Sequence, residues 1–154
     1  MTKGSRWKAN GAGRTKDGKS VARRAQRSSL DDRGTYALVI YLPRPQTIRV
    51  GALGAFRFPR GYYIYIGSAL KGLGARVARH CRKEKKCFWH IDYLLEHARV
   101  IDVWTHASAA RLECQWARAA LTLSNARVVA PRFGASDCHC AAHLVHLRKP
   151  NTEH

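Results

Sequence analysis

The segment Gly61-Tyr62-Tyr63-Ile64-Tyr65-Ile66-Gly67-Ser68-Ala69 carries the clearest structural signal in this chain. Its aromatic and β-branched residues, opened by a glycine, predict a buried strand over residues 62–67. A helix is expected immediately afterwards, with Ser68 as its N-cap, because apolar residues then recur at a spacing of four. These apolar residues are Leu73, Val77 and Cys81. A strand that leads directly into a helix is therefore expected near the middle of the chain.

The sequence on either side of this segment predicts further short strands and helices. Strands are expected at 35–42, 47–50, 56–58, 100–106 and 142–147. Helices are expected at 89–98 and from near 108, the latter with core spacing at Leu112, Trp116, Ala119 and Leu123. An irregular loop follows at 131–140. We therefore expect an α/β (α+β) domain over residues 34–148, a small, mostly antiparallel sheet flanked by helices, with a short tail at 149–154.

The charge of the chain points to a polyanionic partner. Lys and Arg number 28 and Asp and Glu number 10 among the 154 residues, a formal net charge of +18. Such a field concentrates nucleic acid or an anionic membrane around the protein. No apolar run approaches the roughly 18 residues that span a bilayer, so a membrane is not expected. Nucleic acid, with DNA as the expected form, is the predicted partner.

Residues 1–33 form a separate basic segment. Ten basic and three acidic residues give it a net +7, and it has few large apolar side chains. Such a segment buries too little surface to offset its ordering entropy, so a disordered arm is expected. It is either an arm that lies along phosphates or an inert extension.

The five cysteines predict reduced thiols in a cytoplasmic protein, because their number is odd and no export signal precedes them. Cys138, Cys140 and His143 have a spacing that could ligate Zn²⁺. The sequence offers no evident fourth ligand, although Asp137, His139 or Cys81 could lie nearby. A packed loop with neutral thiols is therefore the preferred interpretation. Another places Asp137 and His143 beside the active site.

Two short motifs belong to the predicted first and central strands of the domain. They are Gly34-Thr35-Tyr36 and Tyr65-Ile66-Gly67. Arg76 and His80 follow four residues apart, on one face of the predicted helix. Glu113 lies on a separate predicted helix. Two tyrosines, an arginine, a histidine and a carboxylate in this order resemble the GIY-YIG nuclease superfamily.

The resemblance covers residues 34–147 and is specific to the Uri-type endonuclease branch, a group also found joined to a base-excision glycosylase. Four blocks carry it, in order. They are Gly61 to Ala69, Trp89-His90-Ile91-Asp92-Tyr93-Leu94-Leu95, Leu112-Glu113-Cys114 and Phe133-Gly134-Ala135-Ser136-Asp137-Cys138. The resemblance implies a metal-dependent endonuclease that hydrolyses phosphodiester bonds, in DNA repair or processing.

The resemblance also implies roles for individual residues. Glu113 matches the acidic residue that holds a single Mg²⁺ or Mn²⁺, and Arg76 matches the arginine that contacts the scissile phosphate. Tyr36 matches the tyrosine proposed as general base or as the group that positions water. Tyr65 matches the tyrosine beside it. His80 occupies a position where several members keep a catalytic or supporting polar residue.

The implied chemistry is physically coherent. A hard cation on oxygen ligands stabilises charge on phosphate oxygens, and an arginine fork suits those oxygens. A tyrosine has an unperturbed pKa near 10, so it needs nearby positive charge to act as a base. Which tyrosine takes the proton stays open. Acids are scarce in the chain, which favours one cation on one glutamate over a two-metal site.

Basic residues near the predicted helix after residue 68 are the expected nucleic-acid contacts. They are Lys71, Arg79, Arg82 and Lys83. The main alternative is a non-catalytic nucleic-acid-binding module with the same fold, since the charge suits both functions. A zinc-stabilised interaction domain is a third interpretation.

The same residues have simpler structural interpretations. Glu113 borders an apolar stripe and could be a solvated helix residue. Asp92 and Glu96 lie four apart and could bind metal, but we expect them on the charged outer face of their helix. His90 either packs in the core or contacts nucleic acid.

The chain departs from the family pattern at two places. Thr35 stands where isoleucine is usual, which a strand tolerates. The two motifs are separated by more chain than a tight hairpin needs, so residues 43–60 must form an elaborated hairpin or an extra strand.

Overall fold

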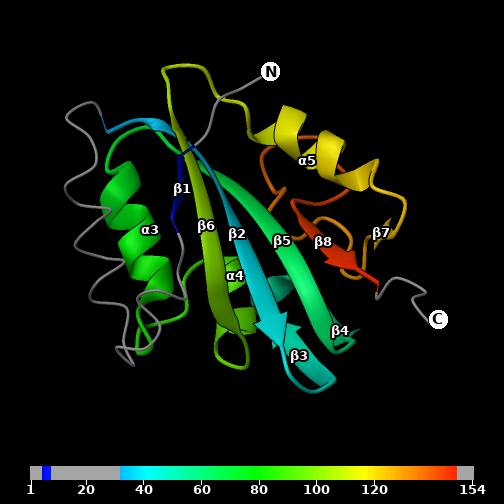
Figure 1. The fold of residues 1–154 in the computed structure, drawn as a ribbon. Helices are drawn as coiled ribbons and strands as arrows, with labels where there is room; N and C mark the ends of the chain where they lie inside the picture. The colour runs from blue at the N-terminus through cyan, green and yellow to red at the C-terminus, as the bar shows by residue number, and fades with distance from the viewer. Residues whose placement is uncertain (1–4, 8–31, 149–154) are drawn as a thin grey trace.

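The computed structural model describes residues 5–7 and 32–148. Within them a six-stranded sheet has the order β1-β6-β2-β5-β8-β7, and every pairing in it is antiparallel. Strands β3 and β4 form a separate two-stranded hairpin. Helices α3 and α4 lie on one side of the sheet and α5 on the other (Figure 1). The predicted α+β domain with a mostly antiparallel sheet is confirmed.

The strands and helices follow one another along the chain with short connections. The strands are β1 (Ser5–Trp7), β2 (Gly34–Leu42), β3 (Gln46–Val50), β4 (Gly54–Phe58), β5 (Gly61–Ala69), β6 (Arg99–Ala107), β7 (Ala126–Arg127) and β8 (Leu144–Leu147). The helices are α3 (Leu73–Cys81), α4 (His90–Leu95) and α5 (Glu113–Leu121), with a 3-10 turn at Gly51–Leu53.

Strand alternation separates two apolar clusters. The main core takes every second residue of β2, from Tyr36 to Leu42, together with Val77 of α3 and Leu94 of α4. The intervening positions face α5, where Ala37 and Ile66 pack with Ala117. Because side chains of a strand point alternately to opposite faces, one sheet supports helices on both sides.

The long excursion between the two motifs is the β3–β4 hairpin, as expected for residues 43–60. Its residues Ile48, Val50 and Phe58 are buried in the main core. Strands β2 and β5 pair continuously from Gly34↔Ala69 to Leu42↔Gly61, so the hairpin leaves the sheet at the Leu42 end. The opposite end of the β2–β5 ladder carries both motifs.

Several predicted element boundaries are wrong. Gly72, in the left-handed conformation with φ of 75°, is the N-cap of α3, whereas Ser68 belongs to β5. Helix α5 begins at Glu113 instead of near residue 108. Its predicted core stripe also fails, because Ala119 and Leu123 are exposed and Ala117 is the buried residue. The two shortest strands, β1 and β7, were not predicted from the sequence.

The predicted arm at residues 1–33 lies mostly outside the described residues. Its described part includes Ser5–Trp7, whose backbone pairs with β6 at the edge of the sheet. The predicted tail at 149–154 also lies outside the described residues. Among the helices that the structure describes, none has the length and apolar character needed to cross a bilayer.

Candidate active site

Four of the residues predicted from the sequence line one pocket of about 300 Å³. Tyr36 comes from β2, Tyr65 from β5, Arg76 from α3 and Glu113 from the first position of α5. Strand β8 pairs with β5 only from Tyr62 to Tyr65, and the pocket reaches the part of β5 beyond that pairing. The fold therefore brings together side chains that lie up to 77 positions apart in the sequence. The other lining residues are Ile66, Gly67, Ser68, Phe88, Trp89, His90, Arg111, Gly134, Ser136, Asp137 and His143.

The two motifs are partners across the β2–β5 ladder. Tyr36 pairs directly with Gly67, and its ring packs against that glycine. A Cβ at position 67 would lie 2.5 Å from the Oη of Tyr36, so only glycine allows this approach. The rings of Tyr36 and Tyr65 lie 6.3 Å apart between centroids. The glycine of the second motif thus makes room for the tyrosine of the first.

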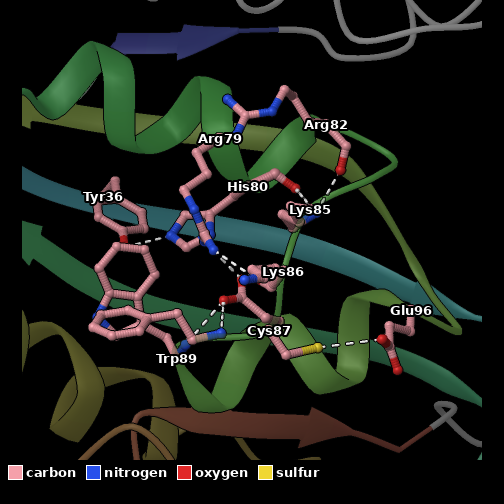
Figure 2. Close-up of polar contacts among 11 residues, drawn as sticks. Tyr36, Arg79, His80, Arg82, Lys85, Lys86, Cys87, Trp89 and Glu96 are labelled. Atoms are coloured by element: carbon pink, nitrogen blue, oxygen red, sulfur yellow. Dashed lines mark hydrogen bonds and ion pairs between the residues drawn. The ribbon is translucent and has the colours of Figure 1, made fainter.

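His80 lies behind Tyr36 and does not line the pocket. Its Nε2 is 2.8 Å from the hydroxyl of Tyr36, and its side chain is buried (Figure 2). Burial lowers the pKa of His80 to about 3, with Asp92 opposing that shift, so the imidazole is neutral. Its Nδ1 has no hydrogen-bond partner within residues 32–148. His80 therefore supports Tyr36 from the interior.

Burial also controls the ionisation of both tyrosines. It raises the pKa of Tyr36 and Tyr65 well above their usual value, although Arg76 acts in the opposite direction on both. Both phenols are consequently protonated in the ligand-free protein at neutral pH. The positive charge expected from the sequence is present at Arg76, but burial outweighs it.

Arg76 and Arg79 share one aromatic neighbour but have different polar partners. Their guanidinium carbons lie 4.5 and 4.6 Å from the ring centroid of Trp89. Arg76 donates a hydrogen bond of 3.1 Å to the carbonyl of Ser68 and pairs with no carboxylate in the described part of the chain. Arg79 forms an ion pair of 2.9 Å with Asp92. It also donates a hydrogen bond to the carbonyl of Lys86 (Figure 2). The positive charge of Arg76 therefore faces the pocket. Arg79 has a structural role, because it connects α3 to Asp92 and Lys86.

Asp92 is a buried structural residue, which corrects the expectation that it lies on an outer face. It accepts hydrogen bonds from the backbone N–H groups of Phe88 and Trp89, at 2.8 and 2.9 Å, as well as from Arg79. Burial acts to raise the pKa of Asp92, but these hydrogen bonds outweigh it and lower the pKa. Glu96 is exposed, as expected, and accepts from the thiol of Cys87. The position of Asp92 orders the segment that carries Trp89 into the pocket.

The three other predicted nucleic-acid contacts lie on the surface. Lys71, Arg82 and Lys83 are exposed at the two ends of α3, whereas Arg79 is tied to Asp92. The three exposed side chains therefore place positive charge on the surface at the ends of α3.

Glu113 is held at the pocket by contacts from several elements. The hydroxyl of Ser68 donates a hydrogen bond to its Oε1, and Arg111 lies 3.5 Å from its Oε2. The preceding residue, Leu112, donates its backbone N–H to Oγ1 of the buried Thr35 at 3.1 Å. The threonine of the first motif therefore fixes the start of α5, a function that isoleucine could not provide.

Sequence reasoning missed several pocket residues. Ser68 was interpreted as a helix cap, and Trp89 was seen only as part of a block. His90 accepts a hydrogen bond of 2.8 Å from the backbone N–H of Gly134 and packs on Phe133, which joins two of the four sequence blocks. The four sequence blocks were the signal that could have identified these pocket residues, because residues from all four blocks line the pocket.

Asp137 and His143 both line the pocket, which is the placement that one of the sequence interpretations gave them. His143 also belongs to a cluster with Cys114, Cys138 and Cys140, whose potential ligand atoms all lie within 4.8 Å of one another. Cys114, the residue after Glu113, was not recognised as a member from the sequence. The group could hold a metal ion.

No curated protein and no solved structure matches the chain. One family model, described as a domain of unknown function, DUF123, matches residues 35–154. The match begins at Thr35 of the first motif and continues through the second motif, Glu113 and the cysteine cluster. The chain therefore belongs to the DUF123 family.

Proposed function

We propose that this protein is a metal-dependent endonuclease of the GIY-YIG type, in the Uri-like branch, that hydrolyses phosphodiester bonds in DNA. The observation that carries the proposal is the meeting of Tyr36, Tyr65, Arg76 and Glu113 at one pocket. The resemblance to the family identified these residues from the sequence, by their type and order and by the four blocks around them. A carboxylate beside an arginine and two phenols suits hydrolysis of a phosphodiester, because mere binding of phosphate needs no acid in the site.

The oxygen-bearing side chains of the pocket suit a hard divalent cation. Glu113 and Asp137 supply carboxylates, and Ser68 and Ser136 supply hydroxyls. Mg²⁺ and Mn²⁺ prefer such oxygen ligands and retain several waters, so one or two protein carboxylates suffice. Glu113 would hold the cation, with Asp137 as the second acid available. A bound cation supplies positive charge to phosphate oxygens and to the leaving group.

The remaining residues have distinct proposed roles. Arg76 binds a non-bridging phosphate oxygen with its planar fork. Water adds to phosphorus and loses a proton, the bond from phosphorus to the 3′-oxygen breaks, and that oxygen takes up a proton. Tyr36, supported by His80, orients the water through its hydroxyl, since burial keeps the phenol protonated until added positive charge lowers its pKa. Tyr65 lies beside Tyr36 and borders the proposed position of this water.

The net charge of +18 also suits a protein that binds nucleic acid without cleaving it. That alternative keeps the basic surface and gives the pocket no catalytic role. The two functions differ in one measurable respect, which is whether Glu113 controls bond cleavage or binding.

The test is a panel of labelled single-strand, duplex, flap and lesion-bearing DNA, with RNA counterparts, incubated with and without Mg²⁺ or Mn²⁺. We expect cation-dependent cleavage that Glu113→Gln lowers by about 100-fold or more, with binding nearly unchanged. Glu84→Gln, at an exposed acid distant in sequence from the motifs, is the matched control and should cleave normally. Binding without cleavage on every substrate would establish the non-catalytic alternative, and full activity in Glu113→Gln would remove the glutamate from the mechanism.

A further inference from the structure

Three cysteines and one histidine converge beside the pocket without a role in the proposed reaction. Cys114 is the second residue of α5, and Cys138, Cys140 and His143 come from the segment between β7 and β8. Their potential ligand atoms lie within 4.8 Å of one another. The Nε2 of His143 is 3.5 Å from Sγ of Cys138 and 3.8 Å from Sγ of Cys114. All five cysteines of the chain are free thiols.

These separations suit a single tetrahedral ion. Zn–S and Zn–N bonds of about 2.3 and 2.0 Å place neighbouring ligand atoms roughly 3.5 to 3.8 Å apart around the metal. Three sulfurs with one imidazole nitrogen form a soft ligand set that selects zinc over the hard cations suited to Glu113. Four protein ligands leave no open coordination position, which is the property of a structural site.

The surrounding segment is built to hold these ligands. The guanidinium of Arg132 donates to the backbone carbonyls of Cys138 and Cys140, both at 2.6 Å. The backbone of His143 donates to Phe133 at 2.7 Å, and its carbonyl accepts from Ile66 of β5 at 2.9 Å. These hydrogen bonds hold the backbone that carries the ligands, as outer-shell contacts do at metal sites.

We infer that Cys114, Cys138, Cys140 and His143 bind one structural Zn²⁺ ion that fastens the 131–143 segment to the first turn of α5. Because Cys114 follows Glu113 directly, the same ion fixes the backbone from which the proposed catalytic carboxylate projects. The zinc site is independent of the proposed nuclease activity, and only the effect on Glu113 depends on it. The zinc acts on the pocket as a positioning element and takes no part in bond cleavage.

The experiment measures metal content and spectroscopy on the full chain. The protein, purified without added metal and without chelator, should contain about one zinc per chain. Replacement of the zinc by Co²⁺ should give the visible bands of a tetrahedral ion together with a thiolate-to-cobalt charge-transfer band. A strong chelator should remove the metal and lower the thermal midpoint. Absence of zinc and cobalt binding, iron in place of zinc, or loss of free thiols to a disulfide would each overturn the inference.

Variants separate the ligands from the other thiols. Cys138→Ser and Cys114→Ser should bind zinc at least about tenfold more weakly, whereas Cys87→Ser, at a thiol outside the cluster, should keep full zinc content. His143→Cys should retain zinc in a four-sulfur site, which shows binding even where a serine variant folds poorly. Glu113→Gln should lose cleavage and keep its zinc, so failure of the nuclease proposal and failure of the zinc proposal give different results. Equal zinc affinity in Cys114→Ser and in the unaltered protein would refute the assigned ligand set.

Discussion

The hydroxyl of Tyr36 lies 2.8 Å from Nε2 of His80, on the inner side of the pocket. The imidazole has one other polar atom, Nδ1, which has no partner in the part of the chain that the structure describes. A second proton would make the ring positively charged, and that charge would be costly there because neither solvent nor a carboxylate reaches Nδ1. The pair therefore joins a neutral imidazole to a protonated phenol, and this neutrality has measurable consequences.

The first prediction concerns acid stability through His80. Its pKa of about 3 in the folded chain lies below the value of about 6.5 in an unfolded chain, so the unfolded state binds more protons between these values. Stability should therefore fall as the pH drops below about 6.5, and at about pH 5 this group should account for about 2 kcal/mol. Urea unfolding of His80→Asn should show a flatter pH dependence in this range. His97→Asn, at an exposed histidine, is the control, and an equal slope in His80→Asn and the unaltered protein would contradict the assignment.

The second prediction separates the two arginines that flank Trp89. Arg76→Gln should lower the cleavage rate by about 100-fold or more with little change in stability, because its charge faces the pocket. Arg79→Gln should instead destabilise the fold by about 3 kcal/mol, because it leaves the buried carboxylate of Asp92 without its partner. Single-turnover cleavage and urea unfolding of both variants give the comparison. The reverse pattern would exchange the roles assigned to them.

The third prediction compares Asp92, which lies in α4, with Glu96, the C-cap residue of the same helix. Asp92 has a lowered pKa in the folded state, so its stabilising contribution is present above the unfolded value near 4 and is lost as the pH falls through the lower native value. Asp92→Asn should cost about 3 kcal/mol at pH 7 and should flatten the acid limb of the stability curve below about pH 4. Glu96→Gln, on an exposed acid four residues later, should do neither. Unfolding midpoints across the acid range measure both slopes, and identical curves for the two variants would count against the buried role of Asp92.

The fourth prediction tests the close approach of Gly67 and Tyr36. Gly67→Ala places a methyl group 2.5 Å from Cζ and Oη of the tyrosine, so the ring must move and stability should fall by about 1 to 3 kcal/mol. Cleavage should fall as well, because the displaced hydroxyl leaves its position. Removal of Oη in Tyr36→Phe relieves part of the clash, so the double variant should be more stable than the sum of the single changes. If the free-energy changes of the two single variants add up to that of the double variant, the side chains at positions 36 and 67 do not interact sterically.

Sequence alone predicted the sheet and the main catalytic candidates because their signals are local. The composition of residues 62–67 predicts a buried strand. Residue type and order identify the four candidates, Tyr36, Tyr65, Arg76 and Glu113. Burial of Asp92 could not be predicted in this way, since Asp92 and Glu96 have the same charge and a four-residue spacing. Their difference arises from Arg79, thirteen positions earlier.

Long-range contacts explain the other failures. Cys114 meets Cys138 and Cys140 only after the chain has passed through α5 and β7, so spacing near residue 140 suggested three ligands and no fourth. The start of α5 is fixed by Thr35, which lies 77 residues away from Leu112. The strands β1 and β7 are three and two residues long, too short for any periodicity to identify them.

The β3–β4 hairpin departs from the sheet at the Leu42–Gly61 pair, and the two motifs meet at the other end of the same ladder. The number of residues between the motifs is consequently independent of how the motifs meet in space. Searches for related chains that require a fixed separation between the motifs will overlook proteins built like this one. A pattern that treats residues 34–36 and 65–67 as cross-strand neighbours, with a variable insertion between them, describes the constraint that folding imposes.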